Sequence, residues 1–255
     1  MIYILIPVFN EADNIPLLAD NITNALQGED KCYVFVDDCS TDDTIAVIKK
    51  YFDGKQLQVI IKEANGGPGD SFNKGFDWIL ADSKSDKDIV VTMEGDNTSD
   101  IGILFTMFTL SRLGYDLVLA SVYAQGGGFN KTSFFRRLIS VIANAIIRFI
   151  FDLKVLTLSS FYRVFSISII RKIKEDYDVI ITEKGFISMV EVLLKAIRSD
   201  ARIIEVPMRL DSSKRKGKSK MKTMKTAFGY FSFLLRDLTK SRKNQSSDYA
   251  GKDKV

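Results

Sequence analysis

The 255-residue chain contains no histidine, only two cysteines and one tryptophan. Without histidine, a Ser-His-Asp triad and a histidine-bound metal are excluded, so a general base must come from Asp, Glu, Lys, Tyr or Cys. Cys32 and Cys39 fit no metal-ligand spacing, which favours a reduced, cytosolic setting. The opening residues, MIYILIPVFN, have neither a basic region nor a small-residue cleavage site, so we expect no secretory signal.

Long uninterrupted hydrophobic runs are also absent. Residues 134–151 are apolar but include three arginines, and the aromatic-rich stretch 226–235 is short and lies between Lys225 and Arg236. Neither reaches the roughly 18–20 apolar residues of a transmembrane helix. Residues 134–151 are instead typical of a core helix, a dimer face, or an interfacial helix that lies on an anionic leaflet.

The chain does contain a regular alternation of apolar runs and amphipathic segments. Runs rich in β-branched residues predict strands at residues 2–9, 32–38, 57–63, 88–94 and 115–123. Helices are expected after the first three, with Asn10 or Asp13 capping one and Ser40 another. This alternation predicts an α/β fold: a single-domain, Rossmann-like, open and mostly parallel sheet with helices on both faces.

The length suits one such domain followed by a tail. Residues 1–212 are predicted to form the catalytic domain, residues 213–240 a basic loop and an amphipathic C-terminal helix, and residues 241–255 a disordered tail. The run from Lys214 to Lys222 is strongly cationic. It is interpreted as a loop closing over phosphates, with a solvated loop or a weak nucleic-acid patch as alternatives.

Four predicted strands end in polar or flexible residues. The carboxyl ends of parallel strands meet at one edge of the sheet, which is where such folds bind ligands. The segments at these ends are Asn10-Glu11, Asp37-Asp38, Asn65-Gly66-Gly67 and Glu94-Gly95-Asp96.

The pair of acids at Glu94 and Asp96 is the strongest single signal. We expect Gly95 to let the backbone bend so that both carboxylates approach one point. Two carboxylates that share a site repel each other unless a cation lies between them. Hard oxygen ligands without Cys or His suit Mg²⁺ or Mn²⁺ bridging to a diphosphate.

Taken in order, these segments resemble a known family. The pieces IPVFNEADNI, FVDDCSTDDT, NGGPGDSFNKGF, VTMEGDNTSD, SSFYRVF and EVPMRLDSSKRKGKSKMK are similar to those of family-2 glycosyltransferases with the A-type nucleotide-sugar-binding fold. The likeness is greatest to the dolichol-phosphate mannosyltransferase group, and it spans roughly residues 2–222. It implies an inverting transferase that uses a nucleotide-sugar donor and a divalent metal.

The resemblance also implies roles for individual residues. Asp96 and Glu191 would be catalytic, and Glu94 and Asp96 would hold the metal. The nucleotide-sugar would be bound by Pro7, Asn10, Glu11, Asp37, Asp38, Asn65, Gly69 and Glu94. The phosphates and the acceptor would be bound by Arg136, Arg137, Arg163, Arg209, Ser219 and Lys220.

Three departures from the family's pattern stand out. Glu94 replaces the usual first Asp of the metal motif, Val122 stands where an arginine is common, and Thr157 stands where an acid is common. These differences bear on the sugar and the acceptor more than on the fold. Glu191 and the Asp37-Asp38 pair also have purely structural interpretations, as a helix acid and as helix caps.

Three functions follow as hypotheses. The first is metal-assisted transfer to a polyprenyl phosphate by a cytoplasmic protein held peripherally on the inner face of the membrane, with no nucleic-acid partner. The second is transfer to a sugar hydroxyl in a cell-surface polysaccharide or lipopolysaccharide. The third is a non-catalytic nucleotide-sugar-binding relative. The sequence leaves the base, the sugar and the oligomeric state open.

Overall fold

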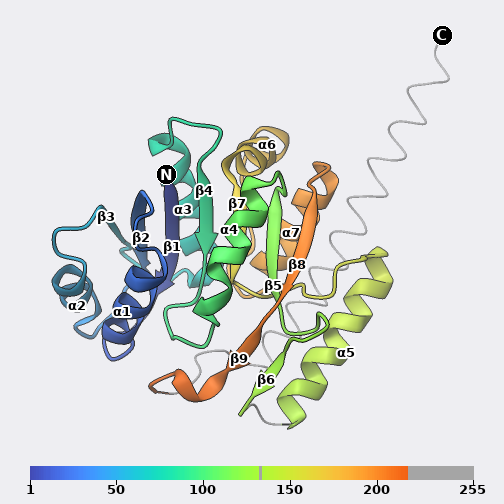
Figure 1. Ribbon diagram of the computed structural model, residues 1–255, viewed down its shortest axis with the longest axis horizontal. Coiled ribbons are helices and arrows are strands. Elements are labelled where there is room, and N and C mark those ends of the chain that lie inside the picture. The colour runs from blue at the N-terminus through green and yellow to red at the C-terminus, as the bar shows by residue number, and fades with distance from the viewer. Residues whose placement is uncertain (132–133, 218–255) are drawn as a thin grey trace. The chain divides into compact units, whose positions relative to one another are not determined.

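A computed structural model describes residues 1–131 and 134–217, and within this part it leaves out the side chains of residues 134–140 and 143. A seven-stranded sheet forms the centre of the protein. The strand order is β3-β2-β1-β4-β7-β5-β8 (Figure 1). The strands are β1 (Ile2–Val8), β2 (Lys31–Asp37), β3 (Leu57–Ile61), β4 (Ile89–Thr92), β5 (Leu117–Ser121), β7 (Arg163–Ser166) and β8 (Ile203–Pro207). Only β7 runs antiparallel to its neighbours in this sheet. The predicted open, mostly parallel sheet is therefore confirmed.

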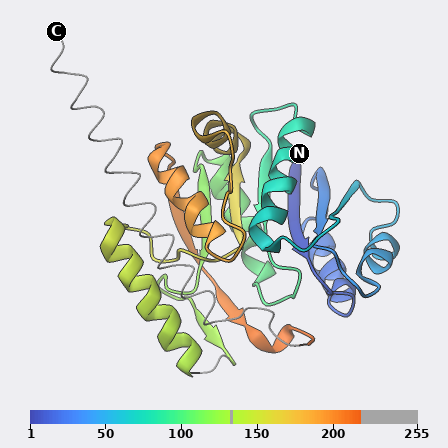
Figure 2. The same cartoon turned by 180° about the vertical axis from the view of Figure 1, so that it is seen from behind.

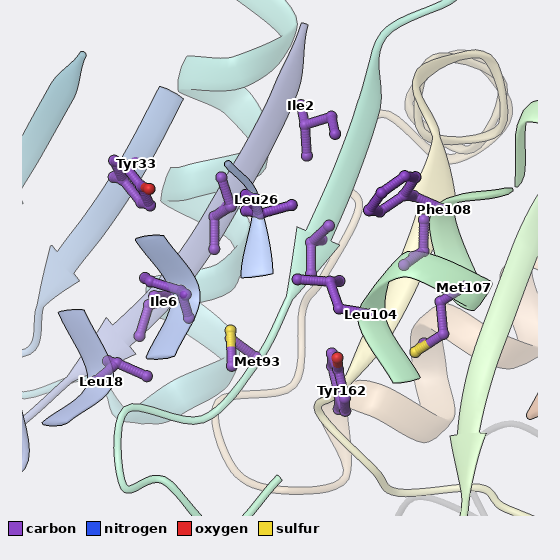
Figure 3. Close-up of a cluster of buried hydrophobic side chains, with 14 of the residues drawn as sticks. Ile2, Ile6, Leu18, Leu26, Tyr33, Met93, Leu104, Met107, Phe108 and Tyr162 are labelled. Atoms are coloured by element: carbon purple, nitrogen blue, oxygen red, sulfur yellow. The ribbon is translucent and has the colours of Figure 1, made fainter. Parts of the chain in front are cut away.

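Helices cover both faces of the sheet (Figures 1 and 2). One face carries α1 (Ile15–Ala25), α2 (Thr44–Tyr51) and α4 (Leu104–Arg112), and the other carries α3 (Gly67–Asp82), α6 (Ile167–Tyr177) and α7 (Ser188–Arg198). Because both faces are covered, the strands read as continuous apolar runs rather than alternating ones. Figure 3 shows the first face, where Leu18 from α1 lies near Ile6 of β1, and Leu104 and Phe108 extend from α4 into the same cluster.

Aromatic rings pack the second face. Phe72 on α3 meets Phe161 edge-on at 5.1 Å between ring centroids, and Phe76 meets Phe165 of β7 in the same way at 5.7 Å. A Cβ on Gly75 would lie 2.1 Å from Leu5 Cδ1, so glycine allows α3 to sit close to β1. This contact holds the middle of α3 against the middle of β1.

The predicted helix caps were wrong. Helix α1 begins at Ile15, two residues after Asp13 and five after Asn10, and α2 begins at Thr44, four residues after Ser40. The residues at the two N-cap positions, Asn14 and Asp43, make no side-chain cap hydrogen bond. Asn10 lies instead in a loop with a left-handed backbone, at φ 53°, and Ser40 accepts a hydrogen bond from its backbone N–H. These polar residues therefore shape the loops at the sheet edge, rather than starting helices.

A smaller two-stranded parallel sheet joins β6 (Gly128–Asn130) to β9 (Arg209–Asp211), and α5 covers Phe134–Phe151. Two single-turn helices, η1 (Ile101–Ile103) and η2 (Ser212–Lys214), lie in loops. Met1–Lys218 form one compact unit. The predicted segments 213–240 and 241–255 fall mostly outside the described residues, so that division of the chain stays a prediction.

Helix α5 has an unusual surface. Its described side chains include Ile147, which is buried, and an exposed apolar group: Val141, Ile142, Ile146, Phe149 and Ile150. Phe149 is 89% exposed. Even so, none of the helices in the described part of the chain combines the length and the apolar character needed to cross a bilayer.

Candidate active site

Three loops leave the sheet edge with constrained backbones. Asn10, Cys39 and Asn97 follow β1, β2 and β4, and each has a left-handed backbone, with φ of 53°, 66° and 63°. Asparagine tolerates this conformation, whereas it strains a cysteine. Strained residues gather at functional sites, where the surrounding structure holds them. Three residues with a left-handed backbone therefore lie at the edge of the sheet where the strand ends predict a site.

The first two loops interlock through hydrogen bonds. The backbone N–H of Asn10 donates to Ser40 Oγ at 2.8 Å, and that of Thr41 donates back to Asn10 Oδ1 at 2.7 Å. The N–H of Glu11 donates to Thr44 Oγ1 at 2.8 Å. Asn10 and Glu11 thus fix the loop positions around any ligand at this edge.

Asp37 at the end of β2 carries an acceptor that is ready for a ligand. The residue is 1% exposed, and its Oδ2 accepts a hydrogen bond from the Ser40 N–H at 3.0 Å. Among the described residues, no donor reaches its buried Oδ1. A buried carboxylate oxygen without a partner is costly, which favours a donor group on a ligand as its partner.

Asp38 is already fully engaged. Its Oδ1 accepts from Lys62 Nζ at 2.5 Å and from the Gly66 N–H at 2.8 Å, and its Oδ2 accepts from the Gly67 N–H at 2.9 Å. Asn65 Nδ2 donates to its backbone carbonyl at 3.2 Å. Through these contacts Asp38 and Asn65 hold the glycine loop in shape, and their expected nucleotide contacts stay a prediction.

Glu94 and Asp96 follow β4, as the sequence indicates. Glu94 Oε2 accepts from Ser99 Oγ at 2.6 Å, and Asp96 Oδ1 accepts from Thr98 Oγ1 at 2.6 Å. Burial, and then the negative charge of Asp96, raise the pKa of Glu94. A cation held by both carboxylates would remove this repulsion, so the pair fits a divalent metal.

Gly95 plays a different part from the one expected. The left-handed residue of this turn is Asn97, and Gly95 instead allows close contact with β1. A Cβ at Gly95 would lie 3.2 Å from Val8 Cγ1 and 3.7 Å from Glu11 Cγ. The glycine therefore brings the acidic loop against the loop that follows β1.

A segment that the sequence analysis did not assign to the metal site lies beside Asp96. We call Asp211–Gly217 the strap. Arg215 Nε donates to Asp96 Oδ2 at 2.6 Å, and its Nη2 contacts the same oxygen. The Asp211 N–H donates to the Thr98 carbonyl at 3.1 Å. The cationic run from Lys214 was the only sequence signal for this contact.

The described residues contain no group of three or more His, Cys, Asp or Glu side chains able to hold a metal. Glu94 and Asp96 are two carboxylates rather than a group of three, and their role as metal ligands stays a prediction. A hard cation there would take its other ligands from diphosphate oxygens and water, as Mg²⁺ commonly does.

Glu191 and Gly69 have structural contacts in this structure. Glu191 is 5% exposed and accepts from the Thr182 N–H, from Thr182 Oγ1 at 2.7 Å and from the Glu183 N–H at 2.8 Å. It also pairs with Lys195 at 2.8 Å. A Cβ at Gly69 would lie 1.8 Å from the Glu183 carbonyl oxygen. Both residues thus fix the loop before α7, and their expected roles as a catalytic acid and a nucleotide contact stay predictions.

Arg163 departs furthest from expectation. Its side chain is fully buried, and its guanidinium donates to the carbonyls of Ser160 at 2.8 Å, Met189 at 2.8 Å and Leu158 at 2.6 Å. A phosphate would have to displace these carbonyls from a packed interior. In this structure Arg163 joins β7 to α7, and the expected phosphate contact stays a prediction that these contacts do not support.

The remaining predicted residues are spread more widely. Pro7 is the second-to-last residue of β1, opposite Val36 on β2, and Arg209 is exposed on β9. Arg136 and Arg137 lie near the start of α5, where side chains are not among those described. The predictions for Ser219 and Lys220 fall outside the described residues.

Together, an open and mostly parallel sheet and a pair of acids beyond its central strand are typical of glycosyltransferases with the A-type fold. The sequence profile described as "Glycosyl transferase family 2" matches residues 3–174, so the chain belongs to this family of glycosyltransferases.

Named relatives share much of the chain. It is 26% identical to a polyprenol monophosphomannose synthase of Mycolicibacterium smegmatis, over 86% of this chain and 80% of that protein. It is 27% identical to a dolichol-phosphate mannosyltransferase of Pyrococcus furiosus, over 91% of this chain and 62% of that protein. It is 26% identical to an undecaprenyl-phosphate mannosyltransferase of Micrococcus luteus, over 85% and 86% of the two chains.

Among solved structures, a glucosyl-3-phosphoglycerate synthase from Mycobacterium tuberculosis, in complex with Mn²⁺, UDP and glucosyl-3-phosphoglycerate, is similar with a TM-score of 0.64. The match covers 92% of this chain and 79% of that chain at 17% identity. At this identity the likeness shows the fold, and it confirms the A-type architecture.

Proposed function

We propose that this glycosyltransferase moves a sugar, with inversion and with the help of Mg²⁺ or Mn²⁺, from a nucleoside-diphosphate sugar to a polyprenyl phosphate at the inner membrane surface. The observation that carries the proposal is the Glu94 and Asp96 carboxylate pair beyond β4, where mutual repulsion calls for a cation. The names of three relatives, all polyprenyl-phosphate mannosyltransferases or synthases, support the acceptor class.

Different residues at the sheet edge would bind the metal and the nucleoside of the donor. Glu94 and Asp96 would hold the metal, which when bound neutralises the charge that develops on the departing diphosphate. The free Oδ1 of Asp37 would accept a hydrogen bond from the nucleoside of the donor. A neighbour of the same fold binds Mn²⁺ and UDP, which supports this arrangement.

The hydrogen bonds and ion pairs of the predicted candidate bases favour a phosphate group over a hydroxyl group as the acceptor. A sugar hydroxyl needs a carboxylate base, whereas a lipid phosphate is already ionised and needs only positioning. The two carboxylates predicted as candidate bases both have partners in this structure. Glu191 accepts hydrogen bonds from the loop before α7 and pairs with Lys195, and Asp96 accepts hydrogen bonds from Thr98 and Arg215. This leaves transfer to a glycan hydroxyl as the second candidate.

A panel of labelled nucleotide sugars tests the proposal. Incubation with Mn²⁺ and polyprenyl phosphate is expected to move label into the organic phase with one donor base, and removal of the metal with EDTA is expected to stop the transfer. Thermal unfolding with UDP, GDP and CDP identifies the base, because a ligand that binds the native state raises its melting temperature. Label found only on added glycans would favour the second candidate.

The exposed apolar group on α5 would place the enzyme at the membrane. Ile142, Ile146, Phe149 and Ile150 recur at helical spacing on one side of α5, and residues 134–151 contain three arginines and no acid. Apolar side chains on one side of a cationic helix suit the interface of an anionic leaflet. Such a surface would bring the sheet edge within reach of a lipid phosphate.

Vesicle flotation tests this surface. Phe149→Asp is expected to weaken binding to vesicles of phosphatidylglycerol and phosphatidylcholine by about tenfold or more, since burying one Phe side chain contributes about 1.5–3 kcal/mol. Leu113→Asp is a matched control, because Leu113 is also exposed, at 73%, but lies at the end of α4. Equal binding by wild type and Phe149→Asp would count against membrane docking through α5.

A further inference from the structure

We infer that Arg215 is a built-in competitor of the divalent metal. In the ligand-free protein its guanidinium neutralises Asp96, and on loading it transfers to the diphosphate of the donor. Metal and nucleotide therefore bind cooperatively, each weakly without the other. This inference rests on the proposed function, because it takes Asp96 as a metal ligand.

The contact geometry sets up the competition. Arg215 places Nε 2.6 Å from Asp96 Oδ2 and directs Nη2 to the same oxygen, while Thr98 occupies Oδ1. Asp96 is 8% exposed, so its charge is shielded from water and depends on this partner. A metal cannot reach Oδ2 while a guanidinium lies against it, because like charges repel strongly at a weakly solvated position.

The strap holds Arg215 at this position through backbone contacts. The Lys216 N–H donates to Asn14 Oδ1 at 2.9 Å, and Asn14 Nδ2 donates to the Lys216 carbonyl at 3.1 Å. Asn14 is 2% exposed, and its own carbonyl accepts from Asn97 Nδ2 at 2.9 Å. The strap is thus fastened to the same loops that carry Asp96, and the Arg215 contact is part of a built arrangement.

Nucleotide binding changes the balance of charge at this point. A metal arriving alone must displace Arg215 and leave the guanidinium without a partner. A diphosphate that arrives with the metal offers anionic oxygens, to which arginine binds with favourable geometry. The new contact with the diphosphate then offsets the loss of the contact between Arg215 and Asp96. By thermodynamic linkage, the nucleotide raises the affinity for the metal by the same factor as the metal raises the affinity for the nucleotide.

Mn²⁺ binding to the full chain, followed by electron paramagnetic resonance and calorimetry, tests the inference. For wild type, saturating UDP or GDP is expected to tighten Mn²⁺ binding by about tenfold. Arg215→Gln is expected to tighten Mn²⁺ binding without nucleotide by a similar factor and to reduce the effect of nucleotide. Lys87→Gln is the control, because Lys87 is an exposed cation that precedes β4, at the opposite end of this strand from Asp96, and it is expected to behave as wild type.

The outcomes separate this inference from the proposed function. Suppose that Asp96→Asn abolishes Mn²⁺ binding but Arg215→Gln leaves the Mn²⁺ affinity equal to that of wild type or lower. The inferred competition between Arg215 and the metal is then wrong, while the proposed role of Asp96 as a metal ligand is retained. If Asp96→Asn does not affect Mn²⁺ binding, or no variant binds Mn²⁺, both are wrong. Asn14→Ala, which unfastens the strap, is expected to act in the same direction as Arg215→Gln and serves as a second variant should that one fail to fold.

Discussion

Asp96→Asn is expected to reduce sugar transfer by roughly 10²–10³-fold while the protein stays folded. The substitution keeps the size of the side chain and its hydrogen bond from Thr98, but it removes the charge that would hold the metal. The departing diphosphate would then lose most of its electrostatic stabilisation. Single-turnover transfer of labelled sugar, with circular dichroism to check folding, measures the effect.

Asp100→Asn provides the control for this variant. Asp100 lies in the same loop but caps η1, where its carboxylate accepts from the Gly102 N–H at 3.0 Å. Its replacement is expected to cost no more than about 1 kcal/mol of stability and to leave turnover near that of wild type. Wild-type turnover in Asp96→Asn would remove the metal role from this residue.

Lys62→Met is expected to lower the free energy of unfolding by about 3–5 kcal/mol. The Lys62 side chain is 4% exposed, and its Nζ lies 2.5 Å from a carboxylate oxygen of both Asp38 and Asp70. Without the lysine, Asp38 would remain buried with only the N–H groups of Gly66 and Gly67 as charge partners. Urea denaturation measures this loss.

The matched control removes the more exposed partner of the same lysine. The Asp70 side chain is 36% exposed, so Asp70→Asn is expected to cost less than about 1 kcal/mol. Nucleotide affinity is expected to fall in Lys62→Met, because the glycine loop loses its anchor, and to be unchanged in Asp70→Asn. Equal stability of the two variants would show that Lys62 does not organise this loop.

The first half of the sheet could be predicted because its strands are buried on both faces. Residues 2–9, 57–63 and 88–94 each contain an observed strand, and residues 32–38 overlap β2 except for Lys31, although β4 ends at Thr92 rather than at Glu94. Strand β7 was not predicted, since it has only four residues and begins with a buried arginine. Its antiparallel direction could not be predicted either, because side-chain periodicity is the same for both directions.

The acids at the strand ends were located by the same reasoning, and the structure brings the loops of Asp37 and of Glu94 and Asp96 to one edge of the sheet. The contacts of Glu191 and Arg163 could not be predicted, because their partners are loop N–H groups and carbonyls, which leave no pattern in the sequence. The contact between Arg215 and Asp96 joins residues 119 positions apart. Only the fold can bring such a pair together.

The late position of β7 in the chain has a consequence for biosynthesis. Strand β4 has β1 on one side from early in translation, but its other neighbour is β7, which follows only at Arg163–Ser166. Ribosomes add roughly 5–20 residues per second, so the free edge of β4 waits several seconds for its partner. During that interval the apolar edge Ile89–Thr92 is open to pairing with another nascent chain, and chaperone dependence would arise there first.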